Sequence, residues 1–567
     1  MIFYDFEVFK YDWLVVLKDT ESKTTTTIVN NSNELKEFYE LHKNDIWAGY
    51  NSRHYDQYIL KAILCDFNPA KVNDWIINKH RGGWEYSGLF WKIQLYNYDV
   101  MTNKFLGLKQ LEGFMGNNIK ESDVSFTIDR KLTDKELEEV IKYCNHDVEQ
   151  TMQVFVNQIE EFNSHMSLIK MFNLPLKNIS KTKAQLSAEI LGASKKDYDD
   201  EMDYKIVDTI KLDKYKSIQN WYSNPNNRDY EKNLNTTVAG VNHIFAWGGL
   251  HGARPNYIGE GVFVNSDVGS FYPSLMLKYD FQSRNINDKS KFQNIYDTRM
   301  KLKHEGKKKE QQPLKIVLNS TYGAMKDKYN NLYDPRQANN VCINGQLLLL
   351  DLIEKLEPYY TLIQSNTDGV MFKLNSIDEL EHYQNICDEW CKRTGMTLEH
   401  DIIKKVVQKD VNNYLIVMQN GKIKSKGGYV KELNNLDNDL PIVNKAIKEY
   451  FINNIPVEKT IHNCDDLKEF QKIIKVSNKY KYALHGDTIL KEKTLRVFAS
   501  RSKKDKGLFK LHSNKNTPDK VANTPIQCFI ENGDLNGVKV PRKLDKSYYI
   551  TLAEKRICDF TGGGIYG

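Results

Sequence analysis

Five residues in the N-terminal third have the side-chain types and spacings that metal-dependent phosphodiester chemistry requires. Asp5 and Glu7 lie two positions apart in a strand-like apolar stretch, so both side chains project from one face. Two carboxylates on such a strand are costly unless a cation neutralises them. Asp56 starts a predicted helix, and Tyr143 and Asp147 lie one turn apart on another. The four acids would together hold two divalent cations, which can activate a water and stabilise the leaving oxygen.

Two further acids, Asp267 and Asp368, each stand at the end of an apolar, strand-like run. Asp368 lies in the sequence SNTDG, where Asp followed by Gly suits a tight hairpin turn. Such an acid can serve the turn alone, and a metal site would usually need more than one carboxylate. Asp267 supplies a second one if its strand lies beside the hairpin. The pair would then hold Mg²⁺ for in-line attack of a hydroxyl on a phosphate.

Cationic and aromatic side chains follow at helical spacing between these two acids. Arg299 and Lys303 are four residues apart. Lys315, Asn319 and Tyr322 follow at spacings of four and three, so each set shares one face of a helix. Three cations on facing helices suit the phosphates of a nucleoside triphosphate, and they suit non-specific DNA binding equally well.

Several structural elements must position these residues. Residues 1–64 alternate strand-like runs with a helical segment, which indicates α/β character. Residues 133–162 have the pattern of a long amphipathic helix, with Thr133 as its N-cap. Residues 214–237 are polar and rich in Asn, and we predict a linker between two large domains there. The last stretch of the chain is mixed and basic, which indicates a separate domain or subdomain.

Composition sets the class of protein. A chain of 567 residues is too long for one hydrophobic core. The 80 basic and 74 acidic residues leave +6, a weak preference for polyanions, but 306–315 and 501–515 concentrate the basic residues. The eight cysteines are scattered, which favours reduced thiols over a zinc site or a disulfide framework. The N-terminus is acidic and apolar runs are short, so we expect a cytoplasmic protein without a membrane span.

The first constellation resembles a known nuclease family. YDFE, NSRHYD and YCNHD, in this order, are similar to the three motifs of 3′–5′ proofreading exonucleases with RNase-H-like folds. The resemblance implies that Asp5, Glu7, Asp56 and Asp147 are metal ligands, that Tyr143 helps to position the attacking water, and that Asn51 contacts DNA. Residues 96–116 also resemble this family, with Asp99 expected to be structural.

The second constellation resembles motifs A, B and C of family B DNA polymerases, carried in order by DVGSFYPS, KIVLNSTYG and NTDG. WGGLHG (247–252) is similar to a Gly-rich segment of small bacteriophage members, and NNYLIVMQNGKIKSKGGYV (412–430) to the lysine-tyrosine motif that grips primer DNA. The implied roles are metal binding by Asp267 and Asp368; triphosphate binding by Arg299, Lys303 and Lys315; lining of the nucleotide pocket by Asn319 and Tyr322; exclusion of a 2′ hydroxyl by Tyr272; and DNA binding by Tyr414, Lys424 and Lys426.

The resemblance implies a multidomain α/β protein, in which an RNase-H-like exonuclease domain precedes a right-hand polymerase. The palm would hold an antiparallel sheet, and the fingers would be short and helical. The expected domains are the exonuclease at 1–165, a linker and helical connection at 166–245, the palm at 246–285 and 329–430, the fingers at 286–328, and the thumb at 431–567.

The implied activity is template-directed DNA synthesis from dNTPs with 3′–5′ proofreading. Two Mg²⁺ or Mn²⁺ ions would serve each active site. The expected partners are primer–template DNA, single-stranded 3′ ends and dNTPs, with a helicase, primase or single-strand-binding protein left open. We expect a monomeric replicative polymerase of a phage or mobile element, working in the cytoplasm of a bacterial host.

The sequence departs from the family pattern at three points. The first acid of motif C is replaced by Asn366, which removes one negative charge. The lysine of the lysine-tyrosine motif is replaced by Asn412, so Lys409, Lys424 or Lys426 must supply the charge. The intervals between motifs A and B and between B and C have no room for the insertions of protein-primed phage polymerases. We therefore predict a compact enzyme that extends a nucleic-acid primer, without built-in strand displacement or high processivity.

Two alternatives remain open at this point. The first is a nuclease whose degenerate polymerase domain only binds DNA, which Asn366 favours. The second is a scaffold or binding protein built on an inactive polymerase fold. Retention of Asp267, Lys315, Asn319, Tyr322 and Asp368 argues against the first, because a domain freed from catalysis has no chemical reason to keep that set, and the eight motif residues positioned for chemistry argue against the second.

Overall fold

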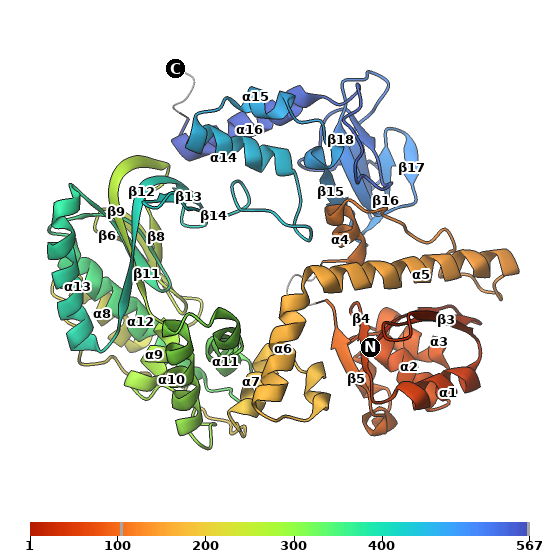
Figure 1. Ribbon diagram of the computed structural model, residues 1–567, viewed down its shortest axis with the longest axis horizontal. Helices are drawn as coiled ribbons and strands as arrows, with labels where there is room; N and C mark the ends of the chain where they lie inside the picture. The colour runs from red at the N-terminus through yellow and green to blue at the C-terminus, as the bar shows by residue number, and fades with distance from the viewer. Residues whose placement is uncertain (102–105, 564–567) are drawn as a thin grey trace. The chain divides into compact units, whose positions relative to one another are not determined.

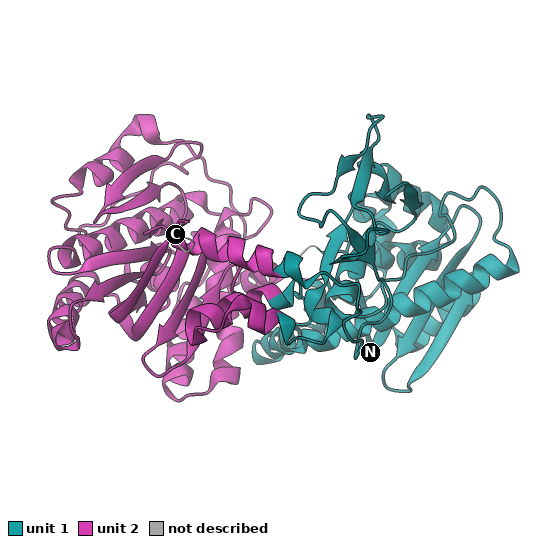
Figure 2. Ribbon diagram, turned by 90° about the horizontal axis from the view of Figure 1, so that it is seen from above, with its two compact units in different colours: residues 1–180, 433–442, 462–549 teal, residues 181–432, 443–461, 550–567 magenta. Residues whose placement is uncertain are grey.

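A computed structural model describes residues 1–101 and 106–563. Within these residues, no helix is long and apolar enough to cross a membrane. The chain divides into two compact units, coloured teal and magenta in Figure 2. Unit 1 comprises residues 1–180, 433–442 and 462–549, and unit 2 comprises residues 181–432, 443–461 and 550–567.

Unit 1 is built on a five-stranded sheet with the order β3-β2-β1-β4-β5. β1 pairs with β2 antiparallel and with β4 parallel. The N-terminal elements are β1 (Ile2–Val8), β2 (Trp13–Asp19), β3 (Thr24–Val29), α1 (Ser32–His42), β4 (Ile46–Gly49), α2 (Asp56–Leu64), α3 (Pro69–Asn73), β5 (Tyr96–Asp99), α4 (Leu108–Met115), α5 (Asp134–Asn157) and α6 (Ile159–Met171).

Helices cover both faces of this sheet, as Figure 1 shows for α5 on one side and α1 and α2 on the other. Phe3 on β1 packs in one core cluster with Val148 of α5. Tyr4 and Phe6 pack in the other cluster with Ile59 of α2. Odd-numbered residues of β1 therefore face α5, and this places Asp5 and Glu7 on the α5 side.

Two small sheets complete unit 1, with the orders β15-β18-β21 and β17-β16-β19-β20. A buried arginine on β18, Arg496, joins them to the N-terminal part, because its guanidinium donates to the carbonyl oxygens of Gly113 (3.2 Å) and Asn117 (2.6 Å). The strands are β15 (Lys472–Lys475), β16 (Tyr480–His485), β17 (Thr488–Leu490), β18 (Thr494–Ala499), β19 (Leu508–His512), β20 (Asp519–Lys520) and β21 (Cys528–Ile530).

Unit 2 contains a nine-stranded sheet with the order β14-β13-β12-β9-β11-β10-β8-β7-β6. Its strands are β6 (Leu234–Val238), β7 (Val241–Phe245), β8 (His251–Ala253), β9 (Tyr257–Val268), β10 (Thr361–Asn366), β11 (Gly369–Leu374), β12 (Leu398–Asp410), β13 (Asn413–Met418) and β14 (Ile423–Lys426). Its helices include α7 (Lys183–Ile190), α8 (Lys216–Ser223), α9 (Phe271–Lys278), α10 (Ser290–His304), α11 (Lys308–Lys326), α12 (Pro335–Leu356), α13 (Leu380–Thr394) and α15 (Val457–His462).

The fold differs from the sequence expectations at two places. Residues 214–237 are not a linker, because they contribute α8 and most of β6 to unit 2, and the division falls after residue 180. The C-terminal segment 431–567 is not one body either. Its residues 462–549 group with unit 1, and the division passes through α14 (Pro441–Asn453) and α16 (Lys546–Thr561). The bonds of Arg496 to α4 and to the loop after it give the physical reason, and no local sequence pattern carries them.

Candidate active sites

Four carboxylates of unit 1 line one cavity of about 1330 Å³. Asp5 and Glu7 reach it from β1, Asp56 from the first turn of α2, and Asp147 from the middle of α5. Asn51 also lines this cavity. The structure therefore brings together the four acids that the sequence analysis identified, and the outermost two, Asp5 and Asp147, lie 142 positions apart in the chain.

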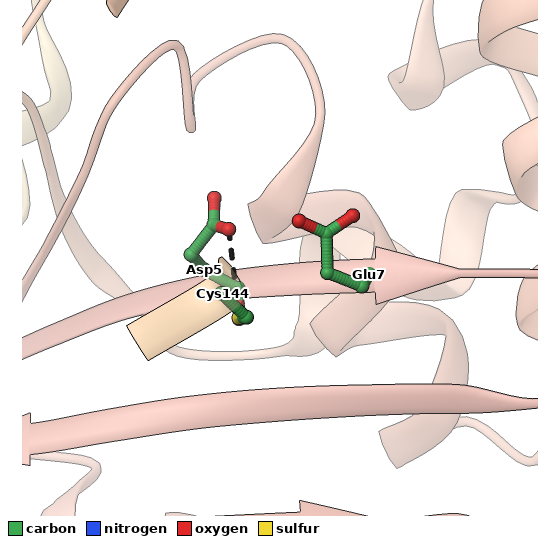
Figure 3. A group of neighbouring side chains, drawn as sticks. All are labelled: Asp5, Glu7 and Cys144. Atoms are coloured by element: carbon green, nitrogen blue, oxygen red, sulfur yellow. Dashed lines mark hydrogen bonds between the residues drawn. The ribbon is translucent and has the colours of Figure 1, made fainter. Parts of the chain in front are cut away.

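Backbone and thiol donors hold the acids on the β1 side of the cavity. Asp56 accepts from the backbone N–H of Phe6 (3.0 Å), which ties α2 to β1. The Cys144 thiol donates to the backbone oxygen of Asp5 (3.3 Å) and lies 3.6 Å from its Oδ2. Figure 3 shows the Asp5 and Glu7 carboxylates side by side above Cys144. One ligand atom from each of these three lies within 4.8 Å of the others.

Burial makes negative charge expensive in this cavity. It raises the pKa of Asp56 to about 7 and that of Asp147 to about 6. The pKa values of Asp5 and Glu7 also rise, first through burial and then through the neighbouring carboxylates. An oxygen-rich cluster of this kind is the donor set that Mg²⁺ or Mn²⁺ prefers, so these residues fit a divalent cation.

Lys109 of α4, which the sequence analysis did not identify, lies beside Asp147. Its ammonium bonds the carboxylate of Asp147 and donates to Glu112 Oε1 (3.1 Å). It also lies 4.6 Å from the ring centroid of Tyr143. Burial lowers the pKa of Lys109, but the carboxylates of Asp147 and Glu112 outweigh this effect, and the pKa ends above its usual value. Lys109 therefore supplies a permanent positive charge beside the acids.

Tyr143 and Asp99 lie near the cluster but have other surroundings. Tyr143 is one helical turn before Asp147 and beside Lys109, and burial raises the pKa of its hydroxyl. Asp99 is buried at the end of β5, where it accepts from the backbone N–H groups of Arg53 (3.1 Å) and Met101 (2.9 Å). These bonds hold the turn together, which matches the structural role expected for Asp99.

The second pair of acids meets at the centre of the sheet of unit 2. β9 and β11 are antiparallel neighbours, and their register places Asp267 opposite Gly369. Val268 N–H donates to the backbone oxygen of Asp368 (2.7 Å), so the hairpin turn is fixed to the end of β9. A Cβ at position 369 would lie 2.1 Å from Asp267 Oδ1, and only glycine admits this approach. The adjacency expected from the sequence is therefore present.

This pair is more open than the cluster of unit 1. Asp267 is half-buried, and burial, followed by the Asp368 carboxylate, raises its pKa to about 6. Asp368 is exposed at the turn. Asn366 accepts from the backbone N–H of Asp368 (3.2 Å), so it shapes the turn. The carboxylate of a third acid, Asp401 on β12, also raises the pKa of Asp267. Lys424 on β14 donates a hydrogen bond to Asp401 (2.7 Å).

The cations predicted to bind phosphate stand on α10 and α11. Arg299 is buried on α10 and donates to the hydroxyl of Ser270, two residues before Tyr272, and to Gln311 Oε1 (3.2 Å). Lys303 forms an ion pair with Glu399, the residue on β12 that lies opposite Asp267. The structure therefore links α10 to both segments that flank the acid pair.

The remaining predicted pocket residues lie on α11 and α9. Lys315 and Asn319 are exposed on α11. The rings of Tyr322 and Tyr272 pack against each other, with centroids 4.5 Å apart and planes inclined by 57°. This ring contact joins α11 to α9.

The segment predicted to grip DNA forms the edge of the same sheet. Tyr414 on β13 pairs with Lys426 on β14 and is half-buried. Burial raises the pKa of its hydroxyl, and the carboxylates of Asp267 and Asp368 raise it further. Lys409 pairs with Asp410 (2.9 Å), and Lys426 is exposed. Lys424 is exposed as well, but it donates to Asp401 (2.7 Å).

Comparisons with known proteins give one curated relative. No family model matches the chain. A stretch of 200 residues, 35% of this chain, is 28% identical to DNA polymerase 1 of Saccharolobus solfataricus, and it spans a fifth (20%) of that protein. Among solved structures, the family B DNA polymerase of the archaeon Pyrobaculum calidifontis matches with a TM-score of 0.44 and 14% identity, over 100% of this chain and 78% of that one. The chain is therefore similar in sequence, over about a third of its length, to part of a DNA polymerase.

Proposed function

We propose that the chain is a family B DNA polymerase that extends a primer with dNTPs and trims 3′ ends with its own exonuclease. The pairing of β9 with β11, which sets Asp267 beside the Asp368 turn, carries the polymerase assignment. The cavity lined by Asp5, Glu7, Asp56 and Asp147 supports the exonuclease. The named relative, a DNA polymerase, supports the same function.

The proposed domains follow the elements. The exonuclease occupies 1–165, the palm is the sheet and helices of 246–285 and 329–430, and the fingers are α10 and α11 within 286–328. Of the segment 431–567 expected to form the thumb, we propose that role for the parts that belong to unit 2, residues 443–461 and 550–567. We further propose a monomeric replicative polymerase of a phage or mobile element, acting in the cytoplasm of a bacterial host.

In synthesis, Asp267 and Asp368 would hold the divalent cations, which when bound neutralise phosphate charge and favour loss of the primer hydroxyl proton. Arg299 and Lys303 would bring positive charge to the triphosphate, together with Lys315. Lys303 must exchange Glu399 for a phosphate oxygen when the nucleotide enters. The Tyr272 ring, fixed against Tyr322, would bound the sugar and leave no space for a 2′ hydroxyl.

In trimming, the four acids of the cavity would hold the cations that activate the water. Lys109 keeps Asp147 in its charged form, because an ammonium beside a carboxylate favours ionisation. Tyr143, one turn away, would orient the water or the scissile phosphate. Asn51, which lines the cavity, would contact the single-stranded 3′ end.

Primer extension on a labelled primer–template with Mg²⁺ tests this assignment. Asp368→Asn should lower synthesis more than about 100-fold and leave trimming intact, because even groups that only orient a metal ligand contribute about 10- to 100-fold. Asp5→Ala should do the reverse. Asp378→Asn, an exposed acid beyond the same hairpin, is the matched control and should change neither.

Normal synthesis by Asp368→Asn would overturn the polymerase site. The replacement of an acid by Asn366 favours one other function, a nuclease whose second unit only binds DNA. That function predicts no synthesis by the unsubstituted protein under any metal condition, with trimming still abolished by Asp5→Ala.

A further inference from the structure

The net positive charge of the chain is concentrated in the two small sheets of unit 1. Residues 472–530 hold 14 Lys and Arg against four Asp and Glu, whereas the whole chain holds 80 against 74. The rest of the chain is therefore slightly acidic. A local excess of this size marks a surface that meets a polyanion.

The four-stranded sheet of this segment has two different faces. Strand register places Ala483 of β16 opposite Leu490 of β17 and Lys510 of β19. Ala483 is buried in a core cluster with Val497 and Leu508, so this row faces the neighbouring three-stranded sheet. The next row, from β17 to β20, must point the other way.

This second face, called the outer face below, is apolar and aromatic. Its central row runs from Ile489 through Leu484 and Phe509 to Lys520, as the cross-strand pairs show. Ile489 is 57% exposed, and the other apolar members are half-buried. Two of the strands that carry it, β16 and β17, lie at the edge of the segment drawn in blue in Figure 1. Its six members are Tyr482, Leu484, Ile489, Phe509, Leu511 and Lys520.

Each of the two aromatic rings on this face has a lysine beside it, an arrangement typical of surfaces that bind nucleic acid. Tyr482 pairs with Leu511, and Leu484 with Phe509, so Tyr482 and Phe509 are diagonal neighbours on β16 and β19, positions whose Cα atoms lie about 7–8 Å apart. Lys481 lies 6.0 Å from the Tyr482 ring centroid, and Lys520 lies directly opposite Phe509. Rings at this spacing can each take an unstacked base, with cations beside them for the phosphates.

We propose that the outer face binds single-stranded nucleic acid, with bases stacked on Tyr482 and Phe509 and phosphates near Lys481 and Lys520. A duplex does not fit this chemistry, because its bases are already stacked on one another. A protein partner would account for the apolar row, but the excess of 14 basic over four acidic residues in the segment that carries this face favours a polyanion. The site is additional to the proposed catalysis and does not depend on it.

Photocrosslinking of the full chain locates the strand directly. A single-stranded oligothymidylate that carries 5-iodouracil should crosslink to Tyr482 or Phe509, in the presence of a chelator that prevents trimming. The same sequence as a blunt duplex should not crosslink there. Single-stranded DNA and RNA arms identify which polynucleotide the face prefers. Crosslinks at the cavity of unit 1 alone, with none between residues 480 and 520, would overturn the proposal.

Binding by fluorescence anisotropy separates stacking from simple apolar docking. The double variant Tyr482→Ala/Phe509→Ala should weaken single-strand binding at least about five-fold with an unchanged salt slope. Tyr482→Phe/Phe509→Tyr keeps both rings and should retain affinity. Lys481→Gln/Lys520→Gln should reduce the salt slope by about one to two.

Two controls decide between occupants. Tyr359→Ala removes an exposed ring of unit 2 and should have no effect on this binding. Ile489→Ala removes apolar surface from the outer face without removing a ring. If it weakens binding as much as the loss of both rings, or if the ring variants weaken duplex binding alone, the face is not a single-strand site.

Discussion

The two acid sites of this chain differ in how the negative charge of their carboxylates is balanced. In unit 1, four carboxylates are gathered in one cavity, and the buried Lys109 is bonded to Asp147 at its edge. In unit 2, Asp368 is exposed and Asp267 only half-buried, while one of the predicted phosphate-binding lysines, Lys303, is paired with Glu399.

The two sites acquire their balancing positive charge from different sources. The cavity of unit 1 is assembled in the folded chain, so its charge must be balanced by protons or cations at all times. The pair in unit 2 is more open to solvent, and Lys303 becomes available to a phosphate only when a substrate displaces Glu399. The first site should therefore respond to pH and metal through stability, and the second through nucleotide binding.

The largest expected effect is a pH-dependent stabilisation of unit 1 by metal. Acids in an unfolded chain titrate near pH 4, but burial raises the pKa of Asp56 to about 7 and that of Asp147 to about 6. Between about pH 4 and these raised values, the folded state keeps protons that the unfolded state has lost, so the free energy of unfolding falls as pH rises. The loss from Asp56 alone is of the order of 4 kcal/mol.

Thermal unfolding with chelator and with Mg²⁺ or Mn²⁺, between pH 5 and pH 8, measures this effect. The gain in Tm from metal should grow with pH, because the cation replaces the protons that leave. Asp56→Asn keeps the hydrogen bond from Phe6 but cannot ionise, so its metal-free Tm should fall less over this range. A metal-induced gain that is the same at pH 5 and pH 8 would contradict the buried-charge account.

The second effect concerns the lysine beside Asp147. Lys109→Met should lower trimming about 10- to 100-fold, because it removes the charge that keeps Asp147 ionised and in position. The acidic limb of the pH–rate profile should move to higher pH, since the pKa of Asp147 rises without its ammonium partner. Lys109→Arg should restore most of the profile. A lower rate with an unmoved profile would indicate a packing role alone.

Strand and helix periodicity predicted much of these sites. A spacing of two residues placed Asp5 and Glu7 on one face of a strand. The SNTDG hairpin and the strand that ends at Asp267 predicted that Asp267 and Asp368 are adjacent. Thr133 caps α5 as predicted. These features depend on residues near each other in sequence or on a repeated geometry.

The partners that complete the sites were not predictable in the same way. Lys109 bonds an acid 38 residues away, and Lys303 bonds Glu399 across 96 residues. Arg496 donates to backbone carbonyls near residue 115, which no side-chain pattern marks. Each contact depends on how separate elements pack, so a single sequence carries the charged residue without its partner.

A smaller effect is expected from the ion pair between Lys303 and Glu399 in unit 2. Glu399→Gln removes the negative partner of Lys303, so the lysine no longer has to break an ion pair to reach a phosphate. Exposed pairs contribute about 0.2–1 kcal/mol, and KM for dNTP should therefore fall about two- to five-fold with kcat little changed. Steady-state extension measures both constants. Glu260→Gln, which removes the partner of Lys405 elsewhere on β9, is the matched control and should leave KM unchanged. A raised KM would show that Glu399 itself supports the site.

The smallest effect concerns the missing acid of the hairpin. Asn366 shapes the turn through its bond to the backbone N–H of Asp368, and an aspartate can accept the same bond. Asn366→Asp should therefore keep the turn and add one negative charge beside Asp267, whose pKa is already raised to about 6. The Mg²⁺ concentration for half-maximal synthesis should fall about two-fold at neutral pH, and less at higher ionic strength, because the added charge is partly exposed to solvent. Titration of synthesis with Mg²⁺ at two salt concentrations measures this shift. An unchanged requirement would show that the charge at position 366 has no part in metal binding and that Asn366 serves the turn alone.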